Sequence, residues 1–272
     1  MRVRRSERLI RVTQSLLEQP NQPVSLSDLA ERLGAAKSSL SEDVALIRSV
    51  FHEDHSGVVQ SIAGAAGGVK FQVRVPPARR EAFENLLVAR LSDPTRILPG
   101  GFLYMSDVLG DPEVLDIAGR LFAEQFAARD VQAVVTVETK GIPLAVATAR
   151  YLRVPVAVVR RDHRVTEGAS VSIHYISGSE RRIQTMSMSK RAMPHGARAL
   201  VVDDFMKAGA TARGVMNLLA EFDAQVAGVA VFVATQEPAV KLVPEYVSLF
   251  NLGPLREGQK VILTPALPPA EP

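Results

Sequence analysis

Two adjacent carboxylates stand where an apolar stretch gives way to a short loop, in the sequence "LVVDDFMKAGATARG" (residues 200–214). Burial of Asp203 and Asp204 is unfavourable unless donors hydrogen-bond to them, and the two hydroxyls of a ribose are suitable donors. A helical pattern follows, and consecutive N–H groups at a helix N-terminus beside a threonine hydroxyl are typical of a monophosphate site. The residues predicted to bind this phosphate are Ala208, Gly209, Ala210 and Thr211. An acidic pair that binds a metal or only caps a helix is the alternative.

A second loop, Glu138-Thr139-Lys140-Gly141, follows the apolar residues 131–137. Lys140 supplies a cation and Gly141 permits an unusual backbone turn, so Thr139, Lys140 and Gly141 can hold a pyrophosphate. An ordinary strand-to-helix turn with a surface lysine is the alternative. We expect both loops at the carboxyl ends of strands, where open α/β sheets bind their ligands.

The elements that must position these loops alternate along the second half of the chain. Helical patterns cover residues 113–130, 142–152 and 211–222, and apolar strands are predicted at 131–137, 155–161, 197–204 and 225–234. Strands that alternate with helices indicate an α/β fold, with a mostly parallel sheet covered by helices on both faces.

Residues 1–74 have a different pattern, with three helices and a hairpin around the glycine-rich residues 64–68. Two short helices, a tight turn and a glycine-tipped hairpin are typical of a winged helix-turn-helix domain that binds DNA. Small hydroxyls and a lysine at the start of the third helix can reach bases and phosphates. The predicted DNA contacts are Lys37, Ser38, Ser39 and Ser41 on that helix, Lys70 past the hairpin tip, and Arg4 and Arg5 of an N-terminal arginine cluster. A helical bundle that merely dimerises is the alternative.

The paired prolines of "PPARR" (residues 76–80) predict a linker, so we expect domains at residues 1–74 and 75–272. A helix is predicted at residues 80–93 and a loop at 94–102. The proline-rich tail "LTPALPPAEP" (residues 263–272) is expected to be loose.

Composition excludes several kinds of chemistry and several classes of protein. The 272 residues carry a net charge of +3 and no cysteine, which excludes disulfides and thiolate chemistry and indicates the cytoplasm. The basic N-terminus lacks the apolar core of a secretory signal, and no apolar run is long enough to span a bilayer. The five histidines have no metal-ligand spacing, so no metal site is predicted; they are His52, His55, His163, His174 and His195.

The stretch "VVDDFMKAGAT" resembles the phosphoribosyl pyrophosphate (PRPP) motif of type I phosphoribosyltransferases, and "ETKG" resembles their pyrophosphate loop. With the winged-helix pattern, the chain to about residue 255 resembles the purine operon repressors of Gram-positive bacteria. The similar stretches include "AKSSLSEDV", "GAAGGVKF", "RILPGGF", "VTEGASVSIHYISGS" and "RIQTMSMSKR". The resemblance implies a dimeric regulator of purine genes in which PRPP, with Mg²⁺, releases the protein from DNA.

One position favours a sensor over an enzyme, although other phosphoribosyltransferases function without the aspartate in question. In 6-oxopurine phosphoribosyltransferases the third residue after the acidic pair is an aspartate that handles the purine proton, whereas here it is Lys207. A protonated lysine is a poor base but pairs well with phosphate. Phe205 belongs to the core or borders the ribose or a base. A non-enzymatic repressor is therefore predicted; the alternative is an active purine or xanthine phosphoribosyltransferase with an N-terminal oligomerisation domain.

The basic segment from Arg160 to Arg191 has three open interpretations: a catalytic lid, a pyrophosphate clamp, or a surface that extends the DNA contact. Our hypothesis is that Arg160 and Arg161 serve both phosphate ligand and DNA, so that PRPP and DNA compete. Charge reversal at both positions should then weaken DNA binding. The site shape also predicts that a guanosine alarmone carrying an extra pyrophosphate competes with PRPP.

Overall fold

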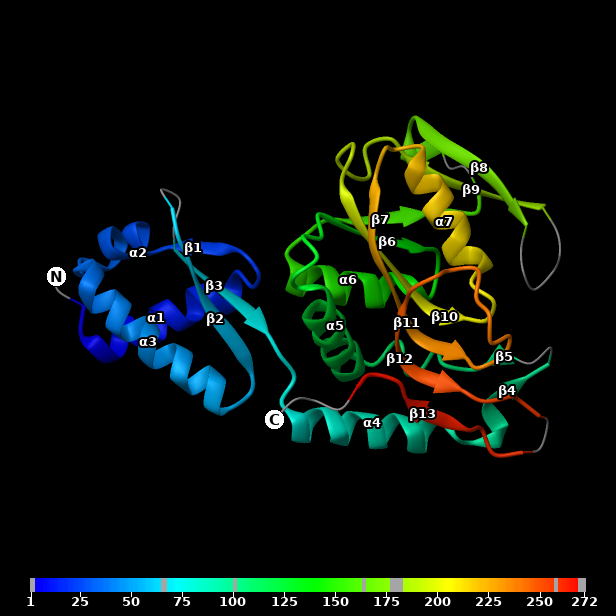
Figure 1. Cartoon of the computed structure of the whole chain (residues 1–272), viewed down its shortest axis with the longest axis horizontal. Helices are drawn as coiled ribbons and strands as arrows, with labels where there is room; N and C mark the ends of the chain where they lie inside the picture. Colours follow the sequence, from blue (N-terminus) through cyan, green and yellow to red (C-terminus); the bar gives the residue numbers. More distant parts are fainter. Residues whose placement is uncertain are drawn as a thin grey trace.

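The computed structural model describes residues 3–64, 68–99, 102–162, 165–176, 183–256 and 259–268, in two parts that contact each other (Figure 1). The N-terminal part contains α1 (Arg5–Glu18), β1 (Pro23–Ser25), α2 (Leu26–Leu33), α3 (Lys37–Glu53), β2 (Gly57–Ile62) and β3 (Gly68–Val73). The three predicted helices and the hairpin are confirmed as a winged helix-turn-helix arrangement. The short strand β1 was not predicted, and it pairs with β3 to give the antiparallel order β1-β3-β2. Hairpin residues 65–67 lie outside the described residues.

Local signals in the sequence explain where these helices begin and end. The Ser25 hydroxyl accepts a hydrogen bond from the Asp28 N–H (3.2 Å) at the start of α2, and Gly34 ends this helix in the left-handed conformation (φ +57°). Asp43 of α3 is fully buried and accepts hydrogen bonds from Arg8 and from Arg5 (3.3 Å). These two bonds fasten α1 to α3.

The C-terminal part is built on a six-stranded sheet of order β13-β12-β11-β10-β6-β7. All neighbouring strands are parallel except the pair β12 and β13, which confirms the predicted mostly parallel sheet. Its strands are β6 (Ala133–Val137), β7 (Val156–Val159), β10 (Arg198–Met206), β11 (Gln225–Thr235), β12 (Val247–Leu252) and β13 (Leu263–Pro265). The last two strands were not predicted.

Helices cover both faces of this sheet (Figure 1). Leu200 and Val202 of β10 pack in one cluster with α5 (Pro112–Phe126) and α6 (Gly141–Leu152). Val201, from the opposite face of the strand, packs in a second cluster with α7 (Ala210–Ala220). The hairpin of β8 (Ser170–Ile176) and β9 (Ile183–Ser189) packs beside α7. The two-residue period of a strand therefore sorts neighbouring side chains between the two layers.

The predicted linker is wrong for most of its length. Helix α4 (Pro77–Leu91) begins at Pro77, since proline is favourable in the first turn of a helix, where its missing N–H has no acceptor to lose. Arg80 is buried in this helix and donates to the Glu84 carboxylate (2.8 Å) and the Leu267 carbonyl (3.0 Å).

Two further expectations for this region need correction. The tail is not loose as far as residue 268, because β13 pairs with β12 and Leu267 is 9% exposed. The predicted loop at residues 94–102 contains a 3₁₀ turn (Pro94–Arg96) and a small hairpin of β4 (Ile97–Leu98) and β5 (Phe102–Leu103).

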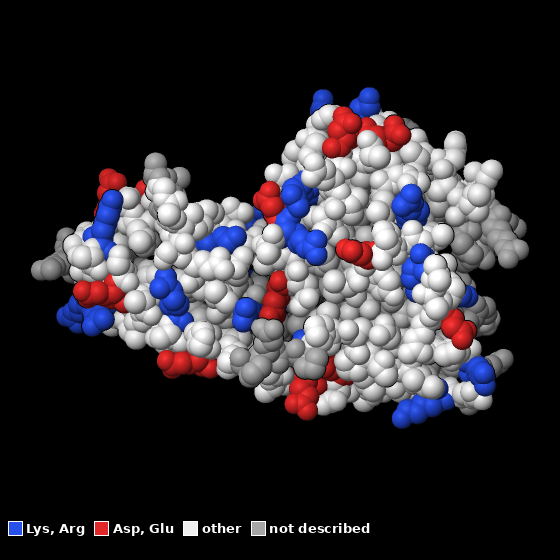
Figure 2. All heavy atoms as spheres, viewed as in Figure 1, with Lys and Arg blue, Asp and Glu red and all other residues white. Residues whose placement is uncertain are grey.

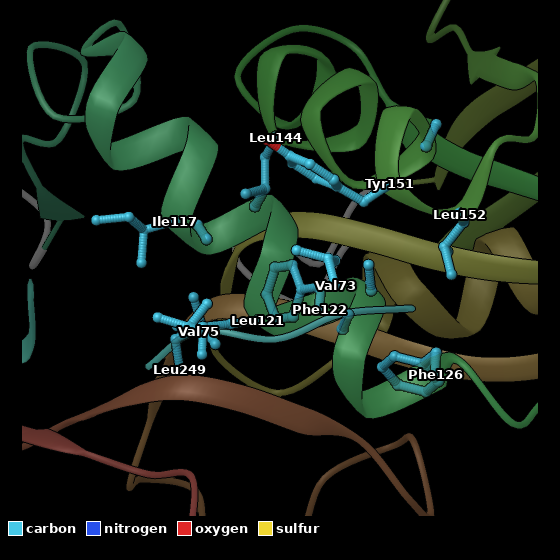
Figure 3. Close-up of a cluster of buried hydrophobic side chains, with 14 of the residues drawn as sticks. Val73, Val75, Ile117, Leu121, Phe122, Phe126, Leu144, Tyr151, Leu152 and Leu249 are labelled. Atoms are coloured by element: carbon cyan, nitrogen blue, oxygen red, sulfur yellow. The ribbon is translucent and has the colours of Figure 1, made fainter. Parts of the chain in front are cut away.

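The two parts share a hydrophobic cluster at their junction (Figure 3). Val73 lies beside Phe122 of α5, and Val75 lies beside Leu121 of the same helix and Leu249. The domain boundary predicted between residues 74 and 75, which stays a prediction, thus falls within one packed cluster. Polar contacts flank it: the Asn21 amide donates to the Leu152 carbonyl (3.3 Å), and the Val75 N–H donates to the Glu124 carboxylate (3.3 Å).

The packing of α4 gives a matched pair of variants. Leu87 is fully buried, whereas the preceding Leu86 is 48% exposed. We expect Leu87→Ala to reduce the free energy of unfolding by about 2–5 kcal/mol through lost burial and a cavity. Leu86→Ala should change it by only about 0.5 kcal/mol. Chemical denaturation of both variants tests this, and an equally small loss in both would contradict the packing of α4 on the sheet.

Candidate functional site

The order of the strands defines where a ligand can bind. From β6 the chain winds through α6 to β7 on one side, and from β10 it winds through α7 to β11 on the other (Figure 1). Strands β6 and β10 are adjacent and parallel, so the loops that follow them leave the same edge of the sheet, and we call the place between these two loops the crevice. In open α/β sheets this reversal of winding is the usual ligand site.

The acidic pair lies at this crevice. Asp203 and Asp204 are half-buried, and β10 continues past them to Met206, two residues beyond the predicted end of the strand. The Asp204 N–H donates to the Asp203 carboxylate (2.9 Å). Burial, together with repulsion from the Asp204 carboxylate, raises the pKa of Asp203 well above its usual value. Burial also raises the pKa of Asp204, against the opposing effect of the Lys140 charge. Hydrogen-bond donors or a cation from a ligand would therefore stabilise the ionised form of the pair.

The predicted phosphate loop opens α7. Gly209 precedes the helix with φ +84°, and no side chain caps the helix start. The first N–H groups of a helix have no intrahelical acceptor, so those of Ala210 and Thr211 are available to a ligand. Ala208, Ala210 and Thr211 are half-buried and Lys207 is exposed, while Phe205 is half-buried against the core. We call residues 207–211 the 207–211 loop.

The predicted pyrophosphate loop opens α6. The peptide between Glu138 and Thr139 is cis, Thr139 and Lys140 are exposed, and Gly141 is buried as the first residue of the helix. A Cβ on Gly141 would lie 2.3 Å from the Thr136 hydroxyl and 3.5 Å from the Asp203 carboxylate. The fold thus brings the two predicted loops together, and only glycine permits this close approach.

A third segment, after β7, reaches the same edge. The Arg161 N–H donates to the Glu138 carboxylate (3.0 Å), and the Arg160 guanidinium bonds Glu138 (3.0 Å) and Glu167 (2.6 Å). The positive charge of Arg161 favours the ionised form of Asp203 and partly offsets the rise in the pKa of that carboxyl. Sequence reasoning missed these carboxylate partners because nothing in the spacing of Glu138 and Glu167 links them to Arg160.

Much of the basic segment from Arg160 to Arg191 forms a 3₁₀ turn (Val165–Glu167) and the β8–β9 hairpin. The hairpin lies close to α7, since a Cβ on Gly214 would be 3.1 Å from Met186 and 3.2 Å from Tyr175. Arg164, Arg181 and Arg182 lie outside the described residues. Whether the segment acts as lid, clamp or DNA-binding surface stays a prediction.

Of the residues predicted to contact DNA, Arg160 and Arg161 lie at the same sheet edge as the crevice, and the others lie apart from it on the N-terminal part. Lys37, Ser38 and Ser41 are exposed at the start of α3, Ser39 is half-buried, and Ala36 offers no side-chain cap to the helix. Lys70 is half-buried in the central strand β3, and Arg4 and Arg5 are exposed. Figure 2 shows basic and acidic side chains interspersed on this part, with a group of basic side chains where the two parts meet.

Sequence reasoning also missed the segment after β11. The Lys241 ammonium donates to the Lys207 carbonyl (2.6 Å), and the Leu242 N–H donates to the Ala208 carbonyl (2.8 Å). This segment has no motif, and only the fold places it against the 207–211 loop.

Comparison with known proteins fits both parts of the chain. Residues 4–73 match the family described as bacterial purine repressor, N-terminal, and residues 105–259 match the phosphoribosyl transferase domain. The purine biosynthesis transcriptional repressor PurR of Bacillus subtilis (strain 168) is 48% identical over 262 residues, covering 96% of this chain and 92% of that protein. The chain belongs to the bacterial purine repressor family. In this family, the purine biosynthesis transcriptional activator PurR of Lactococcus lactis subsp. lactis (strain IL1403) is 40% identical over 250 residues, 92% of each chain.

A solved structure supports the fold of the C-terminal part alone. Adenine phosphoribosyltransferase from Rhodothermus marinus aligns with a TM-score of 0.51 at 22% identity, over 62% of this chain and 99% of that chain. Among the described residues, no helix is both long and apolar enough to cross a membrane. Within the same residues, no three histidine, aspartate or glutamate side chains gather as a metal site.

The raised pKa of Asp203 predicts a gain in stability when its charge is removed. An acid with a raised folded-state pKa contributes most to stability below the ordinary aspartate pKa of about 3.9, and this contribution is lost as the pH rises toward the folded-state pKa. Asp203→Asn should therefore raise the melting temperature of the ligand-free protein at pH 7.5, by a margin that narrows toward pH 4.5. Thermal unfolding across this range tests it, with the exposed Asp54→Asn as control. A variant less stable than the wild type at pH 7.5 would contradict the assignment.

The close approach at Gly141 predicts a clash that a second change relieves. Gly141→Ala places a methyl group 2.3 Å from the Thr136 hydroxyl, which is buried and, within the described part of the chain, has no hydrogen-bond partner. We expect the single variant to lose about 1–3 kcal/mol of stability, as overpacked sites do. Adding Thr136→Ala should restore most of it, because the clashing atom is gone. Denaturation curves of the single and double variants decide, and no recovery in the double variant would refute the contact.

Proposed function

We propose that this protein is a DNA-binding transcriptional regulator of purine biosynthesis genes, and that PRPP bound in the crevice between β6 and β10 releases it from DNA. The proposal rests on one observation above all: a winged helix and a converging pair of phosphate-type loops occur in the same chain. Membership of the purine repressor family supports it, since relatives similar over more than nine-tenths of this chain are named as transcriptional regulators.

The crevice suits the parts of PRPP. The 5′-phosphate would meet the N–H groups of the 207–211 loop and the Thr211 hydroxyl, at the positive end of α7. Asp203 and Asp204 would accept the ribose hydroxyls, which would relieve the cost of their burial. The pyrophosphate would meet Lys140 and the start of α6, and its Mg²⁺ would be held mainly through the ligand's own phosphates.

A sensor is favoured over an enzyme by the side chains around the acidic pair. Lys207 is exposed and occupies the position of the aspartate that handles the purine proton in 6-oxopurine phosphoribosyltransferases. Phe205 is half-buried against the core and would border the ribose or a base. No side chain at this position of the loop would then take a proton from a purine.

The N-terminus of α3 would enter the DNA groove, with its uncapped N–H groups and Lys37, Ser38, Ser39 and Ser41 facing phosphates and bases. Lys70, Arg4 and Arg5 would add phosphate contacts. Arg160 is already bonded to Glu138 and Glu167, so Arg161 is the better candidate for a cation shared between ligand and DNA. Charge reversal of Arg161 should weaken DNA binding more than charge reversal of Arg160.

Helix α6 offers a physical route for release. It begins at Gly141 in the pyrophosphate loop and ends about 18 Å away, at 1.5 Å per residue, at Leu152. The Leu152 carbonyl accepts a hydrogen bond from the side-chain amide of Asn21 in the winged-helix part. A shift of the helix on ligand binding would thus change how the DNA-binding part is held.

The same proposal extends to partners. A guanosine alarmone with an extra pyrophosphate would compete with PRPP at the crevice, and a homodimer would present two winged helices to one DNA site. A regulator of genes acts where the chromosome lies, so we place the protein in the cytoplasm.

Binding of labelled DNA from upstream of purine biosynthesis genes tests the proposal. Fluorescence anisotropy at 100 mM salt should show tight binding that Mg²⁺–PRPP weakens at least about tenfold, equivalent to about 1.4 kcal/mol. An Asp203→Asn, Asp204→Asn double variant should bind DNA but ignore PRPP, and the alarmone should restore binding lost to PRPP.

Each contrary result has its own meaning. Without DNA binding the regulator proposal fails, and release of pyrophosphate from PRPP with purine bases then tests the transferase alternative. Tight DNA binding that PRPP leaves unchanged rejects the effector but keeps the regulator. No competition between the alarmone and PRPP rejects the alarmone.

A further inference from the structure

We propose that Lys241 is a positioning residue, which turns the peptide groups of the 207–211 loop so that their N–H groups face the ligand. This inference rests on the proposed phosphate site and adds a residue that no sequence motif contains.

The contacts of the segment after β11 reach three successive residues of the loop. The Lys241 ammonium donates to the Lys207 carbonyl (2.6 Å) and the Thr235 carbonyl (2.7 Å), with the Thr235 hydroxyl at 3.3 Å. The Leu242 N–H donates to the Ala208 carbonyl (2.8 Å). Val243 is buried and lies 3.2 Å from where a Cβ on Gly209 would stand. The loop is held from one side along its first half.

Peptide geometry converts these contacts into an orientation. In a planar trans peptide the C=O and the following N–H point in opposite directions. Because Lys241 holds the Lys207 carbonyl, the Ala208 N–H must point away from Lys241. The Leu242 contact fixes the Gly209 N–H in the same way through the Ala208 carbonyl. Both N–H groups are thereby turned away from the segment after β11.

The charge of Lys241 adds to this effect. Its partners are oxygens of backbone and hydroxyl groups, and among the described residues it forms no salt bridge. An ammonium on a carbonyl oxygen polarises the whole peptide and strengthens its N–H as a donor. Partial burial lowers the pKa of Lys241, which fits an ammonium without a carboxylate. A neutral side chain of similar length would keep the packing and lose the hydrogen bond that orients the Lys207–Ala208 peptide.

The test compares two ligands that use different halves of the crevice. Ribose 5-phosphate probes the 207–211 loop, and inorganic pyrophosphate with Mg²⁺ probes the 138–141 loop. Lys241→Met in the full chain should weaken binding of ribose 5-phosphate about tenfold, the equivalent of one charged hydrogen bond, and leave pyrophosphate binding within twofold. Calorimetric titration gives both affinities, and the exposed Lys260→Met is the control.

A spectroscopic readout separates positioning from simple stabilisation. The backbone amide signals of Ala208 and Gly209 in ¹⁵N–¹H spectra should shift in Lys241→Met and stay in place in Lys260→Met. Unchanged ribose 5-phosphate affinity, or an equal loss for both ligands, would overturn the role of Lys241 and leave the proposed site intact. A wild-type protein that binds neither ligand would overturn the proposed site and this inference together.

Discussion

The reversal of winding between β6 and β10 is the constraint on which the candidate site depends. Because the two strands are adjacent and parallel, α6 and α7 both begin at the same edge of the sheet, at Gly141 and Ala210. Each helix start carries partial positive charge from unpaired N–H groups. The crevice therefore has two positive helix ends beside one acidic pair, which is complementary to a sugar whose hydroxyls donate hydrogen bonds and which carries two anionic phosphate groups.

The residues proposed to bind the ligand lower the stability of the ligand-free fold. Asp203 and Asp204 are adjacent and half-buried, with raised pKa values, and the buried Thr136 hydroxyl beside Gly141 has no hydrogen-bond partner among the described residues. Elsewhere in the sheet, apolar side chains such as Val134, Val201 and Val231 are fully buried. These two departures from good packing and solvation lie where the proposed ligand would compensate them.

The sequence predicted the elements with strong periodicity and missed those whose stability comes from long-range pairing. The alternation of apolar strands and helices placed β6, β10, α6 and α7. Strands β12 and β13 carry no comparable signal in the sequence. Strand β13 is short and contains a proline, and it is held in place by its pairing with β12. Pro77 was interpreted as part of a linker, although it begins α4. Proline is common both in linkers and at the first position of a helix, so the residue type alone does not distinguish them. The 138–141 and 203–211 segments were found by their composition, whereas Glu167 and Lys241 reach them only through the fold.

The same geometry bears on why such a fold can sense rather than react. A transferase must bind its sugar phosphate and also supply a group that manages the proton of the attacking base. Here the proposed ribose phosphate site has an acidic pair, a glycine and a threonine, while Lys207 is exposed at the position where a transferase of this kind would need a proton acceptor. Binding energy that no reaction consumes is free to shift the balance between two conformations, provided that the ligand favours one of them. Because α6 runs from the crevice to the Asn21 contact, the two parts of the chain share the element that such a shift would move.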